Sequence, residues 1–297
     1  MTRLALATAT VALGADPDED DLLAALAAQG VTAAPVAWDD PRADWSAWDL
    51  VVLRSTWDYP ERLSDFHAWL DEVAAVTAVV NPPSVVRGNT DKRYLARLER
   101  AGVPVVPTTF AEPGEDLALP PDRPVVVKPA VSAGSRDTLR VEAGQRSRAL
   151  ALARSLHAQG RTVMVQPYLA SVDARGETAV ILLDGAVSHG VRKGPILAPD
   201  AGPIEGLHAP EDLSPRAPRD DERAVAQAAL DALEAGGLAY ARVDLVDDDA
   251  GHPRVLEVEL TEPSLFLRLA PGATERLAAG LARRARAARS LAGRRGL

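Results

Sequence analysis

Cysteine is missing from this chain of 297 residues. Its absence excludes disulfides, thiolate metal sites and cysteine nucleophiles, so any catalysis must use other groups. No apolar run approaches the roughly 18 to 20 residues that a membrane span needs. We interpret the short apolar run from Leu4 to Ala15 as a buried strand rather than a secretory signal, because an acidic stretch that opens a helix follows it. We therefore expect a cytoplasmic protein that does not contact a membrane.

Lysine is almost absent as well. The chain contains 33 lysine and arginine residues, but only Lys92, Lys128 and Lys193 are lysine. These three are candidates for positions where a compact ammonium does what a planar guanidinium cannot. The net charge of −9 argues against a nucleic-acid partner, because neutralising phosphates requires a basic face. Any bound phosphate needs local positive charge.

The first third of the chain alternates short apolar runs with helical patterns. This alternation predicts a βαβαβ lobe with a parallel sheet. The apolar runs are Leu4 to Thr8, Ala33 to Trp38, Leu50 to Leu53 and Val79 to Val80, and helices are expected from Asp20 and from Glu61.

A polar and aromatic segment, Arg54 to Pro60, directly follows one of these strands. Parallel sheets bind ligands beyond the carboxyl ends of their strands, which makes this segment a candidate binding loop. A surface turn with two aromatic side chains packed on it explains the same residues equally well.

Antiparallel hairpins are expected in the rest of the chain. A helix from about Asp91 to Ala101 and a linker from Glu112 to Asp122 precede them. Asp184-Gly185 is a strong two-residue turn. The aperiodic segment from Gly194 to Arg219 is interpreted as a lid or substrate loop. The expected strands are Val125 to Ala130, Thr138 to Val141, Val163 to Gln166, Thr178 to Leu183, Ala186 to Arg192, Ala239 to Val246 and Arg254 to Leu260, and helices are expected from Glu222 to Ala235 and from Thr274 to Arg295.

The last of these hairpins carries a charged face. Strand side chains alternate, so Glu257 and Glu259 share one face, as do Arg242 and Asp244 on the partner strand. Three converging carboxylates repel one another unless a hard cation lies between them, and oxygen ligands suit Mg²⁺. A solvated sheet face remains the alternative. The core-facing residues are expected to be Leu256, Val258 and Leu260.

Lys128 ends an apolar strand, and a small-residue loop, Ser132 to Asp137, follows it. Backbone amides of such a loop can approach phosphate closely, which indicates nucleotide binding. The spacing matches neither the P-loop nor the dinucleotide fingerprint, so those folds are disfavoured.

Six motifs occur in an order that resembles the ATP-grasp superfamily. The resemblance covers most of the chain, and the set is more specific than any one of its motifs. The motifs are Asp91-Lys92, Val127-Lys128-Pro129 with its glycine loop, Met164 to Leu169, Gly176-Glu177, Arg242-Val-Asp244 and Leu256 to Glu259.

This resemblance implies an α/β and α+β protein with an ATP-grasp fold, in which ATP lies between lobes. The implied parts are an N-terminal parallel βαβ lobe over residues 1–85 (pre-ATP-grasp, Rossmann-like), a connecting segment over 86–118, a small antiparallel subdomain over 119–172 and a C-terminal antiparallel subdomain with the metal site over 173–297.

The resemblance also assigns roles to residues. Arg242 would neutralise charge in transfer, and Glu259 departs from the family, whose members more often carry asparagine there, which puts the exact ligand set in doubt. The implied ATP contacts are Lys92 and Lys128 on the phosphates, Ser132, Gly134 and Ser135 in a flap over them, Gln166, Tyr168 and Leu169 in the adenine hinge, and Glu177 on the ribose. The implied Mg²⁺ ligands are Asp244, Glu257 and Glu259.

Within the superfamily, three segments look like the O-ureido-serine cyclo-ligase branch of cycloserine (antibiotic) biosynthesis. They are Ser55 to Pro60, His189 with Arg192-Lys193-Gly194, and Glu259 to Ser264. An amino-acid-like substrate needs a cation for its carboxylate and an anion or ring face for its ammonium. The candidates for the first are Arg54, Arg192 and Lys193, and those for the second are Trp57, Asp58 and Tyr59. His189 is a further substrate candidate, or a hairpin surface residue.

The resulting hypothesis is an ADP-forming ligase that uses ATP and Mg²⁺ to activate a carboxylate or ureido-type carbonyl for attack by nitrogen, with Lys193 and Arg242 as catalytic residues. Intramolecular cyclisation and bimolecular carboxylate–amine ligation both remain open. A non-catalytic ATP-binding regulatory protein is disfavoured, because Asp244, Glu257 and Glu259 are all present. The C-terminal helix packs on the core or mediates a homodimer.

Overall fold

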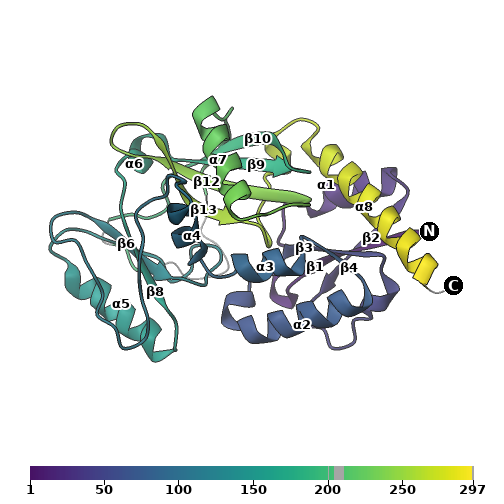
Figure 1. The fold of residues 1–297 in the computed structure, drawn as a ribbon, viewed down its shortest axis with the longest axis horizontal. Helices are drawn as coiled ribbons and strands as arrows, with labels where there is room; N and C mark the ends of the chain where they lie inside the picture. Colours follow the sequence, from purple (N-terminus) through teal and green to yellow (C-terminus); the bar gives the residue numbers. More distant parts are fainter. Residues whose placement is uncertain (200, 204–210, 296–297) are drawn as a thin grey trace.

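The computed structural model describes residues 1–199, 201–203 and 211–295, and these residues form three β-sheets flanked by helices. Figure 1 shows a small lobe with α5 at one end, a parallel lobe with α1, α2 and α8 at the other, and the largest sheet between them. The N-terminus and the C-terminal helix α8 both lie at the parallel lobe (Figure 1). No helix among the described residues is long and apolar enough to cross a membrane.

The N-terminal lobe is a parallel sheet in the order β2-β1-β3-β4. Its central strands are buried on both faces, as parallel strands usually are, because helices cover each side. The connection from β2 to β3 contains only a 3₁₀ turn, and the two helices lie where the sequence predicts them, after β1 and after β3. The elements are β1 (Thr2–Thr8), α1 (Glu19–Ala28), β2 (Val31–Ala37), the turn Trp45–Ala47, β3 (Leu50–Ser55), α2 (Leu63–Val76) and β4 (Ala78–Val80).

The small lobe is an antiparallel sheet in the order β5-β8-β6-β7, with α5 on one face. Ala149, Ala153 and Leu156 recur at helical spacing on α5 and are buried against this sheet. The expected strands here are confirmed. The elements are β5 (Thr109–Ala111), β6 (Val125–Pro129), β7 (Leu139–Val141), α5 (Arg146–Ala158) and β8 (Val163–Pro167).

The largest sheet is antiparallel, in the order β11-β10-β9-β12-β13. The predicted turn between β9 and β10 is confirmed, because Asp184 and Gly185 have φ angles of 50° and 81°, as a type I′ hairpin turn requires. The elements are α6 (Ser171–Arg175), β9 (Glu177–Leu183), β10 (Ala186–Lys193), β11 (Leu213–Pro215), α7 (Asp220–Ala232), β12 (Tyr240–Asp247), β13 (Pro253–Glu259) and α8 (Ala273–Arg295).

Two other expectations change. The helix expected from Asp91 to Ala101 is shorter, because α4 spans Tyr94–Arg100 and a separate helix, α3 (Pro83–Asn89), precedes it. The segment from Gly194 to Arg219 is not wholly irregular, since β11 within it pairs with β10. Residues 200 and 204–210 of the predicted lid lie outside the described residues.

Candidate active site

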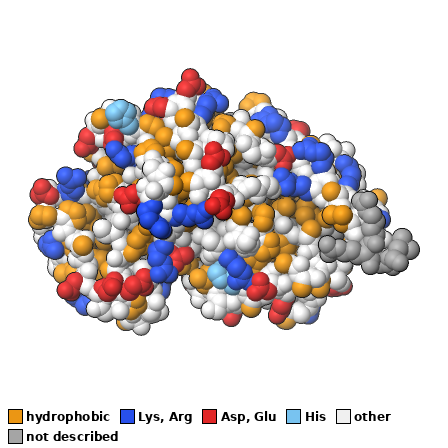
Figure 2. All heavy atoms as spheres, in the orientation of Figure 1, with side chains coloured by type: hydrophobic (Ala, Val, Ile, Leu, Met, Phe, Trp, Pro, Cys, Tyr) orange, Lys and Arg blue, Asp and Glu red, His pale blue; other side chains and the backbone are white. Residues whose placement is uncertain are grey.

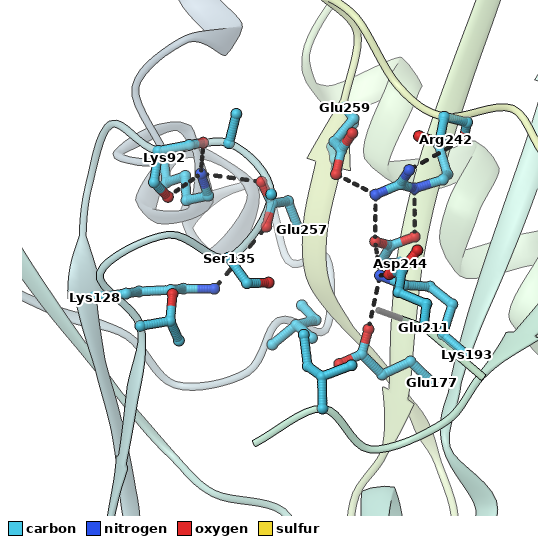
Figure 3. A pocket seen from close by; sticks show the side chains of 18 of the residues that line it. Lys92, Lys128, Ser135, Glu177, Lys193, Glu211, Arg242, Asp244, Glu257 and Glu259 are labelled. Atoms are coloured by element: carbon cyan, nitrogen blue, oxygen red, sulfur yellow. Dashed lines mark hydrogen bonds and ion pairs between the residues drawn. The ribbon is translucent and has the colours of Figure 1, made fainter. Parts of the chain in front are cut away.

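A cavity of about 360 Å³ lies between the two antiparallel sheets and the loops that follow β1 and β3. All three lysines of the chain line this cavity, whereas Arg242 is the one described arginine that does so. Figure 3 shows Lys92 and Lys128 on one side of the cavity and Lys193 and Arg242 on the other. The scarce lysines therefore gather at one site, whereas acidic and basic side chains are mixed over the outer face shown in Figure 2.

The β12–β13 hairpin supplies the acidic wall of this cavity. Its register places Arg242 opposite Glu259 and Asp244 opposite Glu257, so the four side chains share the face expected from their alternation. The register shifts between Asp244 and Leu245. This bulge leaves Leu256 without a partner and turns it to the cavity, so its expected place in the core is wrong.

Each carboxylate on this wall is held by cations (Figure 3). Asp244 is 2.9 Å from the Arg242 guanidinium and 3.0 Å from Lys193 Nζ. Glu257 is 3.0 Å from Lys92 Nζ and 3.9 Å from Lys128 Nζ. Glu259 contacts Arg242. The wall is thus a buried network in which each charge is paired.

Lys193 and Lys128 differ in how strongly neighbouring carboxylates stabilise their charged form. Burial lowers the pKa of Lys193, but Asp244 and Glu177 outweigh it and keep that pKa well above its usual value. Burial also lowers the pKa of Lys128, and Glu257 offsets this only in part. Lys128 therefore has unsatisfied capacity for an anion.

The carboxylates of Asp244, Glu257 and Glu259 are the type of ligand that a divalent cation binds, but their present arrangement does not form a metal site. No group of three His, Cys, Asp or Glu side chains among the described residues is placed to hold a metal ion, because the protein's own cations separate them. Burial, with the charges of Glu257 and Asp244, nevertheless raises the pKa of Glu259 to about 7 despite Arg242. Oxygen ligands with surplus negative charge are the donor set that Mg²⁺ prefers.

The end of the cavity near β8 is apolar apart from one amide. Gln166 donates from Nε2 to Thr108 Oγ1 at 3.0 Å, but its buried Oε1 has no partner. An unpaired buried acceptor is costly unless a ligand supplies a donor, and an aminopurine edge has such a donor. The apolar residues here are Val106, Tyr168, Leu169, Val172, Val246 and Leu256.

The small-residue loop after β6 lies beside the lysines. Gly134 and Ser135 have φ angles of 62° and 60°, and such left-handed residues form backbone concavities that bind anions. Lys92 Nζ donates to the carbonyl of Ser132 at 2.7 Å and to its hydroxyl at 3.0 Å. Lys92 therefore ties the loop to the β12–β13 wall through Glu257.

The predicted ribose contact, Glu177, opposes Lys193 across β9 and β10, and the two side chains form a 3.2 Å ion pair. Gly176 is needed before it, since a Cβ at Gly176 would lie 2.3 Å from the Lys193 carbonyl oxygen. Glu177 thus lies in the cavity, at the edge of the cationic cluster.

The predicted substrate residues divide into two groups. Trp57 and Tyr59 line the cavity, whereas Arg54, Asp58, His189 and Arg192 do not. Because neighbours on a strand point to opposite faces, Lys193 faces the cavity while Arg192 contacts the Arg175 carbonyl and Asp212.

Asp58 and Arg54 are held by other parts of the protein. Asp58 accepts from Trp38 Nε1 at 2.9 Å and from Arg62. Arg54 is 2 % exposed and pairs with Asp16 at 2.8 Å. These contacts hold the end of β3 and the loop after it against their own lobe.

The segment from Leu260 to Leu265, which we call the strap, joins β13 to the N-terminal lobe. Each of its six backbone carbonyls accepts a side-chain hydrogen bond, an arrangement that fixes the strap in place. In chain order the donors are Asn81, Tyr240, Trp57, Arg54, Arg242 and His189, at 2.7, 3.1, 3.3, 3.3, 3.0 and 2.9 Å.

Two further acidic residues of the cavity carried no predicted role. Glu211 lies 3.5 Å from Lys193. Glu262, on the strap, lines the cavity and is 7 % exposed. A signal for the second exists in the sequence, because Glu262 is a charge within the otherwise largely apolar stretch from Leu260 to Leu267.

Comparison with known proteins places the chain in a family. The model of the D-cycloserine synthetase DcsG N-terminal domain matches residues 4–81, and that of the prokaryotic glutathione synthetase ATP-grasp domain matches 118–270. The cycloserine biosynthesis protein DcsG of Streptomyces lavendulae is 41% identical, over 95% of this chain and 98% of that protein. The chain belongs to the DcsG family of ATP-grasp ligases. It is an ADP-forming ligase that makes carbon–nitrogen bonds.

Solved structures agree with this family and its fold. The crystal structure of D-cycloserine synthetase DcsG superposes with a TM-score of 0.89 at 40% identity, covering 95% of this chain and 99% of that one. D-alanine–D-alanine ligase from Bacillus anthracis, complexed with ATP, gives 0.69 at 15% identity, covering 98% and 99%. The second likeness concerns the ATP-grasp fold alone. The resemblance expected from the sequence is confirmed.

Proposed function

We propose that this ligase closes an amino-acid-like ureido substrate, such as O-ureidoserine, into a ring in antibiotic biosynthesis. The observation that carries the proposal is the near full-length match to the cycloserine biosynthesis protein DcsG. In such a reaction ATP supplies a phosphoryl group to a carboxylate or ureido-type carbonyl oxygen, and a nitrogen then displaces phosphate. The cytoplasmic location and a homodimer stay predictions.

The cavity supports a specific placement of the nucleotide. Gln166, with its unpaired Oε1, and the apolar residues near β8 would hold the base. Lys92, Lys128 and the Ser132 to Ser135 loop would hold the phosphates, because they combine charge with a backbone concavity. Tyr168 and Leu169 would flank the base, and Glu177 would lie near the sugar.

Asp244, Glu257 and Glu259 would hold Mg²⁺ in this proposal. A bound Mg²⁺ neutralises phosphate charge and polarises the transferred group. For these carboxylates to converge, Lys92 and Lys193 must release them; an incoming phosphate would then pair with Lys92, and the substrate end with Lys193. Arg242, held by the Ser264 carbonyl at 3.0 Å, would remain in place to stabilise charge on the reacting oxygen.

One experiment separates ring closure from bimolecular ligation. The purified enzyme is given ATP, Mg²⁺ and either enantiomer of O-ureidoserine, with and without added small amino acids, and phosphate release is followed by mass analysis of the product. Ring closure predicts phosphate release without a second amine and a product that contains only atoms of the ureido substrate. Phosphate release that requires a second amino acid would instead establish a peptide-type ligase.

Replacing Lys128 is expected to weaken ATP binding more than replacing Lys193. In the Lys128→Ala variant ATP affinity should fall about 10- to 100-fold, the value of a charge-assisted contact, because the sole described partner of Lys128 is Glu257 at 3.9 Å. Lys193→Ala is the matched variant, since its ammonium is already occupied by three carboxylates. Titration calorimetry with ATP measures both, and unchanged affinity in Lys128→Ala would refute the phosphate assignment.

A further inference from the structure

One carboxylate of the cavity differs from the others in lacking a partner. Seven acidic residues line the cavity. Five are paired with Lys or Arg, and Asp18 accepts from the backbone N–H groups of Leu267 and Arg268 at 3.1 and 3.4 Å. Glu262 is the exception, since no described Lys, Arg or His lies within the 4.0 Å of an ion pair and no other described residue donates to its side chain. The five that are ion-paired are Glu177, Glu211, Asp244, Glu257 and Glu259.

Because no described cation pairs with Glu262, its carboxylate can accept a cation from a ligand. Burial, followed by the charge of Glu259, raises the pKa of Glu262 to about 8. The negative form is therefore poorly stabilised by the protein alone, and a positively charged ligand group would complement it. A buried charge with no partner is otherwise expensive for a fold to keep.

The surroundings of Glu262 favour an ammonium over a metal ion. The carboxylates proposed to hold Mg²⁺, which needs several oxygen ligands, share one face of the β12–β13 hairpin, and Glu262 lies beyond that hairpin on the strap. Instead, the aromatic side chains of Trp57, Tyr59 and Phe266 line the same cavity. Ring faces attract organic cations.

Tyr59 adds a polar group at this place. Tyr59 lines the same cavity as Glu262, and burial, followed by the negative charge of Glu262, holds the pKa of its hydroxyl well above the usual value. The hydroxyl makes no hydrogen bond with a described residue, although the side chain is only 5 % exposed. A primary ammonium has three N–H donors, so it can be shared between the carboxylate and this oxygen.

The strap holds this carboxylate in a fixed position. The backbone carbonyl of Glu262 accepts from Trp57 Nε1 at 3.3 Å, and those of Pro263 and Ser264 accept from Arg54 and Arg242. The same Arg242 contacts Asp244 and Glu259 in the acidic wall. A group bound at Glu262 is therefore held at a defined distance from the reacting end of the cavity, as an efficient site requires.

We propose that Glu262, with the Tyr59 hydroxyl and the Trp57 ring, binds the α-ammonium group of the amino-acid-like substrate. This inference rests on the proposed function and deepens it by naming the residues that hold the α-ammonium group, which is then a binding group and not the attacking nitrogen. It also replaces Asp58, the acidic residue named from the sequence, whose carboxylate is held by Trp38 and Arg62 outside the cavity.

The test compares two substrates on two enzymes at saturating ATP. The substrates are O-ureidoserine and an analogue in which hydrogen replaces the α-amino group, and the readout is phosphate release. Wild-type enzyme should show a KM at least about tenfold higher for the analogue. In Glu262→Gln the KM for O-ureidoserine should rise by that factor, the KM for the analogue should change little, and ATP affinity should stay the same.

Controls separate this role from a structural one. Glu275→Gln, an exposed carboxylate at the start of α8, should leave both KM values unchanged. If Glu262→Gln does not fold, as judged by its thermal transition, Glu262→Asp retains the charge and should raise the amine KM by a smaller factor. Equal KM values for the amine in wild type and in the Glu262 variant, or a loss in kcat alone, would overturn the inference. Wild-type inactivity with both O-ureidoserine enantiomers would instead overturn the proposed function, and this inference with it.

Discussion

Turnover should fall about 1,000-fold or more in Asp244→Asn and in Glu257→Gln, while both variants remain folded. An amide keeps the shape of the side chain but removes the negative oxygen that a hard cation requires. Each change also leaves cations unbalanced, Arg242 and Lys193 in the first variant, Lys92 and Lys128 in the second. The measurement is steady-state phosphate release over a range of Mg²⁺ concentrations.

Asp249→Asn is the matched control for these variants. It lies in the turn of the same hairpin, is exposed, and undergoes the same chemical change. Its turnover and Mg²⁺ dependence should equal those of wild type, and circular dichroism should show all three variants folded. Retained Mg²⁺-dependent turnover in both Asp244→Asn and Glu257→Gln would show that these carboxylates do not hold the metal.

Arg54→Met should lower the free energy of unfolding by about 3–5 kcal/mol, the cost of breaking a buried ion pair by removing one partner. The change leaves Asp16 buried without its cation and the Pro263 carbonyl without its donor. Denaturant unfolding at neutral pH measures the loss. This expectation differs from the one drawn from the sequence, in which Arg54 binds the substrate carboxylate.

A double variant provides the control for Arg54. In Arg54→Met with Asp16→Asn no uncompensated charge remains, so part of the lost stability should return. A substrate-binding role for Arg54 predicts near wild-type unfolding for the single variant with a raised KM for substrate. That pattern would contradict the ion pair as a structural element and return Arg54 to the substrate site.

Local sequence patterns predicted most of the elements for identifiable reasons. The alternation of acidic and apolar residues from Leu256 to Leu260 fixed the exposed face of β13, and Asp184-Gly185 fixed the turn between β9 and β10. The bulge at Leu256 was not predictable, since an extra residue leaves the pattern on either side intact. The separate helix α3 was missed for want of a distinct periodic signal.

The site was predictable only in part, because much of it depends on contacts between distant residues. The small number of lysines in the sequence was enough to indicate Lys92, Lys128 and Lys193 as site residues, and all three line one cavity. Arg54 and Pro263, in contrast, are separated by 209 positions, and no local pattern links them. The strap, and the isolation of Glu262 on it, appear only once the two lobes are placed together.

The most direct test that this enzyme activates its substrate by phosphorylation is to follow an oxygen atom from the substrate into the released phosphate. O-ureidoserine is labelled with ¹⁸O in the carboxylate in one sample and in the ureido carbonyl in another, and each is converted with ATP in ordinary water. Mass analysis of the released phosphate should find one ¹⁸O atom from one of the two samples, and this identifies the activated group. Unlabelled phosphate from both samples would mean that water accepts the phosphoryl group, and would contradict the account.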